Sequence, residues 1–413
     1  MLRRLITFFF LFFVFSSTFS ISISQTAIGI ATVLFVAAAI RERFNPFGGN
    51  LRWFWGAVVA YVGWLIIVCL LQDDPVRALN YIREEWLFVI VPVGIYLMRD
   101  NRTFEHVVKA LAIGLLLISV GSLLMYGLGL KYHWPEGFSP LSYSDLRMQG
   151  NFANALTFGN IAAVASLSVL TWALTQPGRL SGWRAIYLIS GFLGLVGVLF
   201  CGSRGPLLAA LAGLIVLLFY LVRGARRWGW AVLVAVLLIG LLTPSVRSRF
   251  TTELGWHFNR DWPGGRLFIW ERSLDMVAGH LLTGIGPGNF PREYKDRLDP
   301  QVTSRYWYQH AHNDFLEAAT RSGVPGAVTF IGLWVAFFYS IRARFRRAVM
   351  GSQERRVLLL SLIGAVVFLV GSLTEASFSD EEVRAVLMFV WASGLAVAYN
   401  NQESARSGRT TVS

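Results

Sequence analysis

The sequence has 413 residues, of which 55% are hydrophobic and 15% charged. Soluble domains are about 45–50% apolar and about 25% charged, so this composition excludes an ordinary soluble protein and a disordered chain. The net charge is +13, and all but three of the 37 basic residues are Arg. These residues lie in short clusters between apolar runs and form no contiguous basic surface, so we expect no nucleic-acid partner. Cys69 and Cys201 are isolated within apolar runs, which indicates neither a disulfide framework nor a Cys-based metal site.

Apolar runs of near-bilayer length recur along the chain, and a spanning helix needs about 20 mainly apolar residues. The sequence therefore predicts an all-α, polytopic membrane protein with about twelve transmembrane helices. The predicted spans are residues 5–20, 24–40, 52–71, 85–98, 105–129, 152–175, 184–201, 205–222, 228–243, 322–341, 356–372 and 383–399. The first two could merge at Ser20–Ser24. The N-terminal run resembles the start of a signal peptide, but no convincing cleavage site follows, so an uncleaved first span is expected.

The distribution of Arg predicts the orientation, because basic residues accumulate in short cytoplasmic loops. With the N-terminus inside and the spans alternating, the inside segments hold most of the Arg residues, and both termini are cytoplasmic. The short outer segments hold only Arg77, Arg83, Lys131, Arg147, Arg204 and Arg384.

The same alternation places three longer polar segments on the outer face, at 72–84, 130–151 and 244–321. The last is too long for a simple connector and has a helix-like pattern over Leu267–Val277, so we expect a subdomain that caps the outer surface. The predicted organisation is nine transmembrane helices within 1–243, the outer subdomain at 244–321, three transmembrane helices within 322–399, and a disordered tail at 400–413.

Three outer arginines work against this orientation and need another explanation. Arg147 precedes a span, Arg204 lies in a tight connection between two spans, and Arg266 begins a helical pattern. An unpaired Arg within the membrane costs about 2.5–3.5 kcal/mol. Each side chain could snorkel or cap a helix. Together they could instead form an anion site, because guanidinium groups bind phosphate through paired hydrogen bonds. Arg83 lies in a charged outer rim and could add one substrate contact.

A second polar group lies on the outer side, at residues 308–317. Asn313 or Asp314 can cap a short helix there. His310 and His312 lie at its start, where one of them could accept a proton from a hydroxyl near neutral pH. Both could also be capping or interfacial residues. The spacing matches no zinc motif well, so we expect no metal.

Two further segments could contribute to a functional site: the last outer loop and one glycine-rich run. Glu375 or Asp380 could orient a histidine or pair with an outer arginine, or could only solvate the loop. The run Gly284–Phe290 follows no strand, so we reject dinucleotide binding and expect a tight turn.

Taken together, these residues resemble the O-antigen ligase and polymerase superfamily of bacterial envelope glycosyltransferases. The signature is His312-Asn313, nine residues, then Gly323-Val-Pro-Gly326. Supporting segments are Ser203–Gly205, Arg266 with Trp270, Gly284–Phe290 and residues 147–154. Within the superfamily the chain looks most like a ligase that attaches O-antigen to lipid A-core.

The resemblance implies transfer of a glycan from undecaprenyl diphosphate to a sugar hydroxyl of lipid A-core, at the periplasmic face of the inner membrane and without metal or cofactor. His312 would be the base, although His310 is an additional histidine beside it, and Arg204 and Arg266 would bind the diphosphate. Further candidates for substrate binding are Arg147, His310, Asn313, Glu375 and Arg83. The chemistry agrees, because a diphosphate leaves without a proton when fixed cations stabilise its charge. Direct displacement would invert the anomeric centre.

Two alternatives stay open. An O-antigen polymerase would join repeats on the same carrier, and a transporter or flippase would move an anionic lipid-linked glycan. Transporters place charges within spans near the midplane. Here the spans are nearly free of acids and the unusual residues gather outside, which favours an enzyme.

Overall fold

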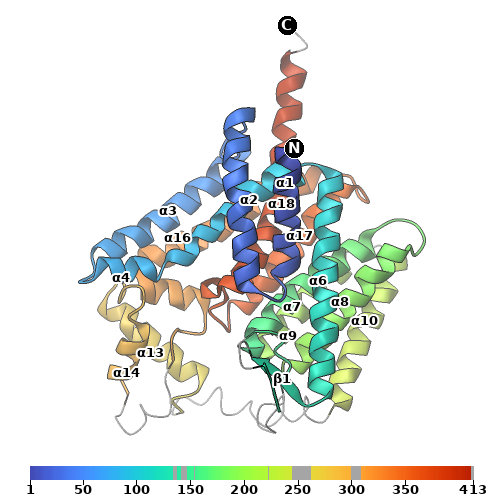
Figure 1. Cartoon of the computed structure of the whole chain (residues 1–413). Helices are drawn as coiled ribbons and strands as arrows, with labels where there is room; N and C mark the ends of the chain where they lie inside the picture. Colours follow the sequence, from blue (N-terminus) through green and yellow to red (C-terminus); the bar gives the residue numbers. More distant parts are fainter. Residues whose placement is uncertain are drawn as a thin grey trace.

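The computed structural model describes residues 1–133, 137–140, 147–152, 154–221, 223–243, 262–298 and 308–410, and this part of the chain is mainly helical (Figure 1). Its one described sheet is the antiparallel pair β1 (Leu130–His133) and β2 (Gly137–Pro140), which pairs Leu130 with Pro140. Seven helical segments are long and apolar enough to cross a membrane. The protein is therefore a multi-pass, helical membrane protein.

The helices of the first half are α1 (Leu2–Ser16), α2 (Ile21–Glu42), η1 (Gly49–Leu51), α3 (Arg52–Leu70), α4 (Pro75–Asn80), η2 (Arg83–Val89), α5 (Ile90–Met98), α6 (Asn101–Gly127), α7 (Ala155–Thr175) and α8 (Gly182–Phe200). The second half contains α9 (Arg204–Tyr220), α10 (Arg223–Leu242), α13 (Arg266–Gly279), α14 (Phe290–Asp296), α16 (Asp314–Arg347), α17 (Gln353–Gly371), η4 (Ser377–Ser379) and α18 (Glu381–Thr410).

Every predicted span contains a helix, but fewer of these helices meet the length and composition of a full span. The seven that do are α2, residues 49–70, α6, α7, α8, α16 and residues 381–399 of α18. The first predicted span forms only the 15-residue α1, and the fourth forms the nine-residue α5 after η2. At 1.5 Å per residue, neither helix alone covers a hydrocarbon core about 30 Å thick. The total of about twelve spans stays a prediction.

The structure decides one boundary that the sequence left open and extends one helix beyond its predicted span. The first two spans do not merge, because α1 ends at Ser16 and Ser20 caps α2 by accepting a hydrogen bond from the Ile23 N–H. Helix α18 continues to Thr410 and so includes most of the tail that composition predicts to be disordered. Glu, Gln, Ala and Arg in that segment are good helix formers.

Small residues let the central helices pack closely. Helices α7 and α18 are the most buried of the seven candidate spans, and α7 packs against α8, α9 and α17. A Cβ on Gly194 of α8 would collide with Ser166 of α7, so the two helices approach nearly backbone to backbone. Small residues serve this purpose in membrane proteins, where the lipid tails are as apolar as the helices. The central helices therefore determine where the loops at their ends lie.

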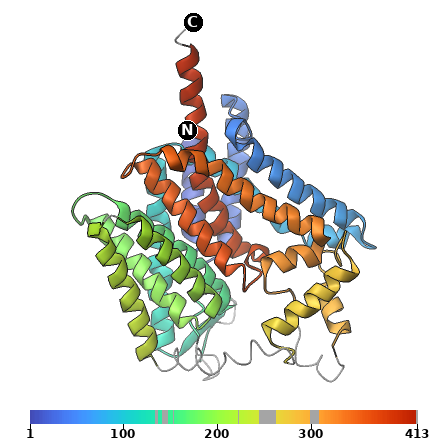
Figure 2. The same ribbon diagram turned by 180° about the vertical axis from the view of Figure 1, so that it is seen from behind.

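Helices α13 and α14, which lie within the predicted outer subdomain, form a small core of their own at the end of the molecule opposite both termini (Figures 1 and 2). Helix α13 confirms the helix predicted at Leu267–Val277. Its Ile269 and Met276 pack with Phe290 and Tyr294 of α14 in a cluster separate from the main core. Residues 244–261 and 299–307 of the predicted subdomain lie outside the described residues.

The glycine-rich run attaches this subdomain to α16. Gly284 has a φ of +63°, and a Cβ there would collide with the Thr320 carbonyl. The adjacent Ile285 N–H donates to the same carbonyl at 2.8 Å. The tight turn predicted at this run is thus confirmed. Helix α16 is kinked at Ser322 and Gly323, so its first turns form the short helix expected before the span.

Candidate active site

Asn313 begins α16 and fixes the end of the helix against the last outer loop. Its Oδ1 accepts hydrogen bonds from the N–H groups of Phe315 at 2.9 Å and Leu316 at 3.1 Å. Its Nδ2 donates to the Leu373 carbonyl at 3.0 Å. Of the two caps that the sequence allowed, the structure uses Asn313. The amide of Asn313 thus holds the start of the helix, and the expected contact of this residue with substrate stays a prediction.

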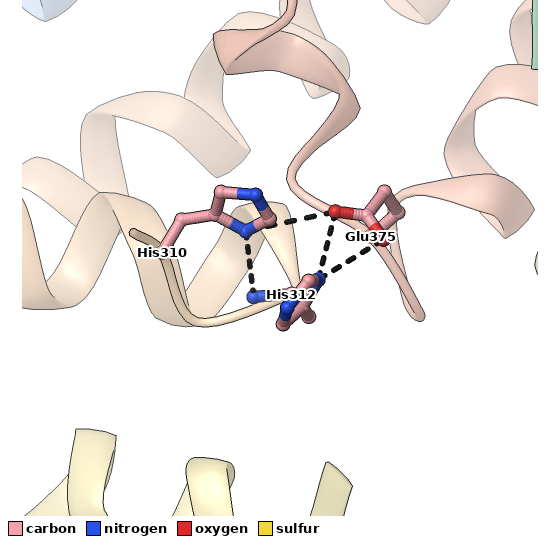
Figure 3. Close-up of side chains that lie close together, drawn as sticks. All are labelled: His310, His312 and Glu375. Atoms are coloured by element: carbon pink, nitrogen blue, oxygen red, sulfur yellow. Dashed lines mark hydrogen bonds and ion pairs between the residues drawn. The ribbon is translucent and has the colours of Figure 1, made fainter. Parts of the chain in front are cut away.

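His312 precedes this cap in a left-handed backbone conformation, with a φ of +51°. That conformation costs a non-glycine residue about 1–2 kcal/mol. It turns the ring towards Glu375, whose two carboxylate oxygens lie 2.9 and 3.1 Å from Nδ1 of His312 (Figure 3). A proton on Nδ1 donates to the carboxylate, so Nε2 of the neutral ring carries a lone pair. His312 is therefore held in the tautomer that a general base needs.

His310 has a different environment, although the two imidazole ring centres are only 4.2 Å apart. Nδ1 of His310 accepts a hydrogen bond from the backbone N–H of His312 at 3.3 Å. Burial lowers the pKa of His310 to about 4, even though Glu375 opposes that change from 3.6 Å away. His310 is therefore neutral near pH 7, with its proton on Nε2. The geometry separates the two histidines and favours His312 as the base.

Glu375 joins the histidines to Arg266. The Arg266 guanidinium lies 3.4 Å from Oε2 of Glu375, and Arg266 is the first residue of α13. Burial alone would raise the pKa of Glu375, but His312, His310 and Arg266 outweigh it and lower that pKa to about 2. The carboxylate is thus charged at every physiological pH. Glu375 both orients a histidine and pairs with an outer arginine, as the sequence allowed.

The loop that carries Glu375 is fastened at several points. The Asp314 N–H donates to the Ser372 carbonyl at 2.9 Å, and the Asp314 carboxylate accepts from the Phe378 N–H at 2.9 Å. Asp380, the other acid considered from the sequence, accepts a hydrogen bond from Thr157 at 2.7 Å and holds the start of α18. These contacts fix the carboxylate of Glu375 relative to α16.

Arg204 and Arg147 lie on the other side of the same loop. Arg204 is the first residue of α9, and a Cβ on the next residue, Gly205, would collide with the Thr374 hydroxyl. Arg147 donates from Nε to the Cys201 carbonyl at 2.8 Å and from Nη2 to the Ser203 hydroxyl. Arg147 therefore holds the connection that leads into Arg204. Of the three residues expected to converge, His312 and Arg266 contact Glu375, and Arg204 precedes the glycine that lies against Thr374. The approach of the Arg204 side chain to this pair stays a prediction.

Arg83 does not join this group. Its Nε lies 3.8 Å from Glu381, and its side chain is 70% exposed. Arg83 belongs to the charged rim that the sequence indicates, and there it pairs with Glu381.

Sequence reasoning missed a buried ion pair behind the loop. The fully buried Arg384 lies 3.0 Å from Oε2 of Glu85 and also donates to the Phe378 carbonyl. Arg321 binds the Ser379 hydroxyl at 3.1 Å. A charge inside a predicted span is a functional or structural signal by itself. Arg384 lies at the border between the last outer segment, with which it was counted, and the predicted span 383–399, so the sequence alone did not separate a buried charge from an outer one.

A bound metal fits this cluster poorly. His310, His312 and Glu375 each offer a ligand atom, and these atoms lie within 4.8 Å of one another. However, both Nδ1 atoms already take part in hydrogen bonds, and the positive charge of Arg266 lies beside the carboxylate. A structural zinc site also needs a fourth ligand. The described cluster is better suited to proton transfer than to binding a cation.

One comparison with known protein families gives a match. Residues 189–331 match the family model described as O-antigen ligase. The matched segment includes Arg204, Arg266, His310 and His312, whereas Glu375 lies beyond it. No curated protein matches the chain. The match confirms the resemblance to the superfamily of O-antigen ligases and polymerases.

Proposed function

Starting from the O-antigen ligase and polymerase superfamily, we propose that this protein is an O-antigen ligase. It transfers O-antigen from undecaprenyl diphosphate to a sugar hydroxyl of lipid A-core and so completes lipopolysaccharide. The observation that carries the proposal is the pairing of His312 with Glu375 beside Arg266. This arrangement supplies a base for the acceptor and a cation for the donor within one cluster.

The reaction follows from the charges of the cluster. The acceptor hydroxyl gives its proton to Nε2 of His312 while its oxygen attacks the anomeric carbon of the donor. The bond from that carbon to the diphosphate oxygen breaks, and the electron pair leaves with the diphosphate. Arg266 and Arg204 stabilise the developing negative charge without a metal. Direct displacement inverts the anomeric centre, and Glu375 stabilises the imidazolium that forms.

The location of the cluster supports a periplasmic reaction in the inner membrane. The cluster lies where α16 begins, beside the subdomain that Figure 1 shows opposite both termini. The positive-inside rule assigns both termini and the Arg-rich short loops to the cytoplasm. Both substrates are lipid-linked and reach the site from the bilayer.

The same cluster would serve an O-antigen polymerase, whose acceptor is a second lipid-linked repeat, and the family match includes both activities. A flippase for the lipid-linked glycan needs neither a base nor an acceptor. The three functions therefore differ in what the protein makes from defined substrates.

The test uses purified protein with undecaprenyl diphosphate-linked repeats, with or without lipid A-core, in EDTA. A ligase forms glycan-capped lipid A-core only when both substrates are present. Products from the donor alone would indicate a polymerase, and no covalent product would exclude both enzymes. His312→Ala should abolish the product. His280→Ala is the matched control, because His280 is an exposed histidine at the end of α13.

A further inference from the structure

A cavity of about 720 Å³ lies at the other end of the molecule from the histidines. It is bordered by the start of α3, the C-terminal turns of α16 and Ala398 of α18. Five arginines line it: Arg52, Arg342, Arg344, Arg346 and Arg347. Its volume falls within the range of about 300–1,000 Å³ that is usual for small-molecule sites.

The charge of this cavity is almost uncompensated. None of its lining residues, all within the described part of the chain, is acidic. Arg344 pairs with Glu354, whereas Arg342, Arg346 and Arg347 are exposed. Positive-inside topology explains why arginines occur on this side. It does not require them to surround a hollow, where like charges repel one another unless an anion binds.

Aromatic and apolar groups beside the cavity indicate a lipid. Trp53 and Tyr339 line it and are 57% and 58% exposed, as expected of aromatic residues at a membrane interface. Farther along the same two helices, which pack against each other, Val59 of α3 is 71% exposed and Val335 of α16 is 60% exposed. An amphiphile with its headgroup among the arginines could therefore lay its acyl chains along α3 and α16.

We propose that this cavity binds the phosphate headgroup of an anionic phospholipid in the cytoplasmic leaflet. Basic pockets between transmembrane helices on the cytoplasmic side bind such headgroups. Arg forms paired hydrogen bonds with phosphate oxygens. This site is separate from the histidine cluster and does not depend on the proposed function.

Binding can be measured without any activity assay. Wild-type protein is placed in phosphatidylcholine nanodiscs or detergent, and phosphatidylglycerol binding is followed by native mass spectrometry and by the shift in Tm. We expect the triple variant Arg342→Gln, Arg346→Gln, Arg347→Gln to bind phosphatidylglycerol roughly 100-fold more weakly. Its Tm in phosphatidylcholine alone should equal that of the wild type, which shows that it folds.

The control removes three positive charges from the same face but outside the cavity, at the exposed residues Arg4, Arg41 and Arg102. This variant should bind the lipid like the wild type. An equal loss in both variants would show unspecific attraction and overturn the proposal, as would no loss in the cavity variant. Displacement of the lipid by millimolar inorganic phosphate would identify a site for free phosphate instead.

Discussion

Replacing Glu375 by Gln tests the core of the proposed chemistry. The substitution keeps the size of the side chain and an oxygen that can accept from Nδ1 of His312, but it removes the charge. Three neighbouring cations or potential cations lower the pKa of the carboxyl from its ordinary 4.5 to about 2, which corresponds to about 3 kcal/mol of mutual stabilisation. His312 is the first of the three in this effect. In the Gln variant, the imidazolium that forms on His312 during transfer therefore loses part of this stabilisation.

We expect a roughly 10- to 100-fold lower kcat, with a smaller change in the KM for the donor, because Glu375 supports the proton transfer to His312 and not the binding of the diphosphate. The assay is the transfer of radiolabelled glycan to lipid A-core under saturating donor. Glu293→Gln is the matched control, since Glu293 of α14 pairs with Arg297, the residue after that helix, and not with a histidine. A wild-type kcat in the Glu375 variant, with Tm unchanged, would refute the reasoning.

Three further outcomes are expected. The pKa of His310 is about 4 in the folded protein, below its ordinary 6.5, so the unfolded state binds the proton first as the pH falls. The free energy of unfolding should therefore fall by up to about 3 kcal/mol as the pH drops from 6.5 towards 4. Urea titrations across that window should show a flatter pH dependence for His310→Asn, and an unchanged slope would contradict this. Gly284→Ala places a Cβ against the Thr320 carbonyl at a residue with left-handed backbone, so thermal unfolding should show a loss of about 2–4 kcal/mol in the free energy of unfolding. Gly279→Ala meets open space and should be neutral or stabilising. Arg266→Lys keeps the charge but not the forked donors, so the KM for the diphosphate-linked donor should rise about tenfold, and an unchanged KM would argue against phosphate binding there.

The candidate residues of the site could be selected from the sequence because each one breaks a rule for its predicted surroundings. Arg204 and Arg266 are basic residues on the outer side, and His312 belongs to a spaced signature. Such exceptions are visible in a sequence without any coordinates. The match over residues 189–331 supports the superfamily that these exceptions suggested.

The signature favoured His312 over His310, but the different environments of the two rings were not predictable from the sequence. These environments depend on the φ of His312 and on the hydrogen bond from its N–H to His310, and both result from how α16 meets the loop after α17. Hydropathy also marks apolar runs but not helix ends, which is why it could not show that the fourth run forms only the short α5 after a 3-10 turn. The ends depend on caps and tertiary contacts that sequence periodicity does not contain.

The carboxylate that completes the cluster comes late in the chain. Glu375 follows α17, whereas His312 and Arg266 come before it, and the loop is anchored by Arg384 of α18. During biosynthesis His312 and Arg266 leave the ribosome before Glu375, so at first they lack their acidic partner. A chain that ends before Glu375 therefore lacks the carboxylate that holds Nδ1 of His312 and pairs with Arg266.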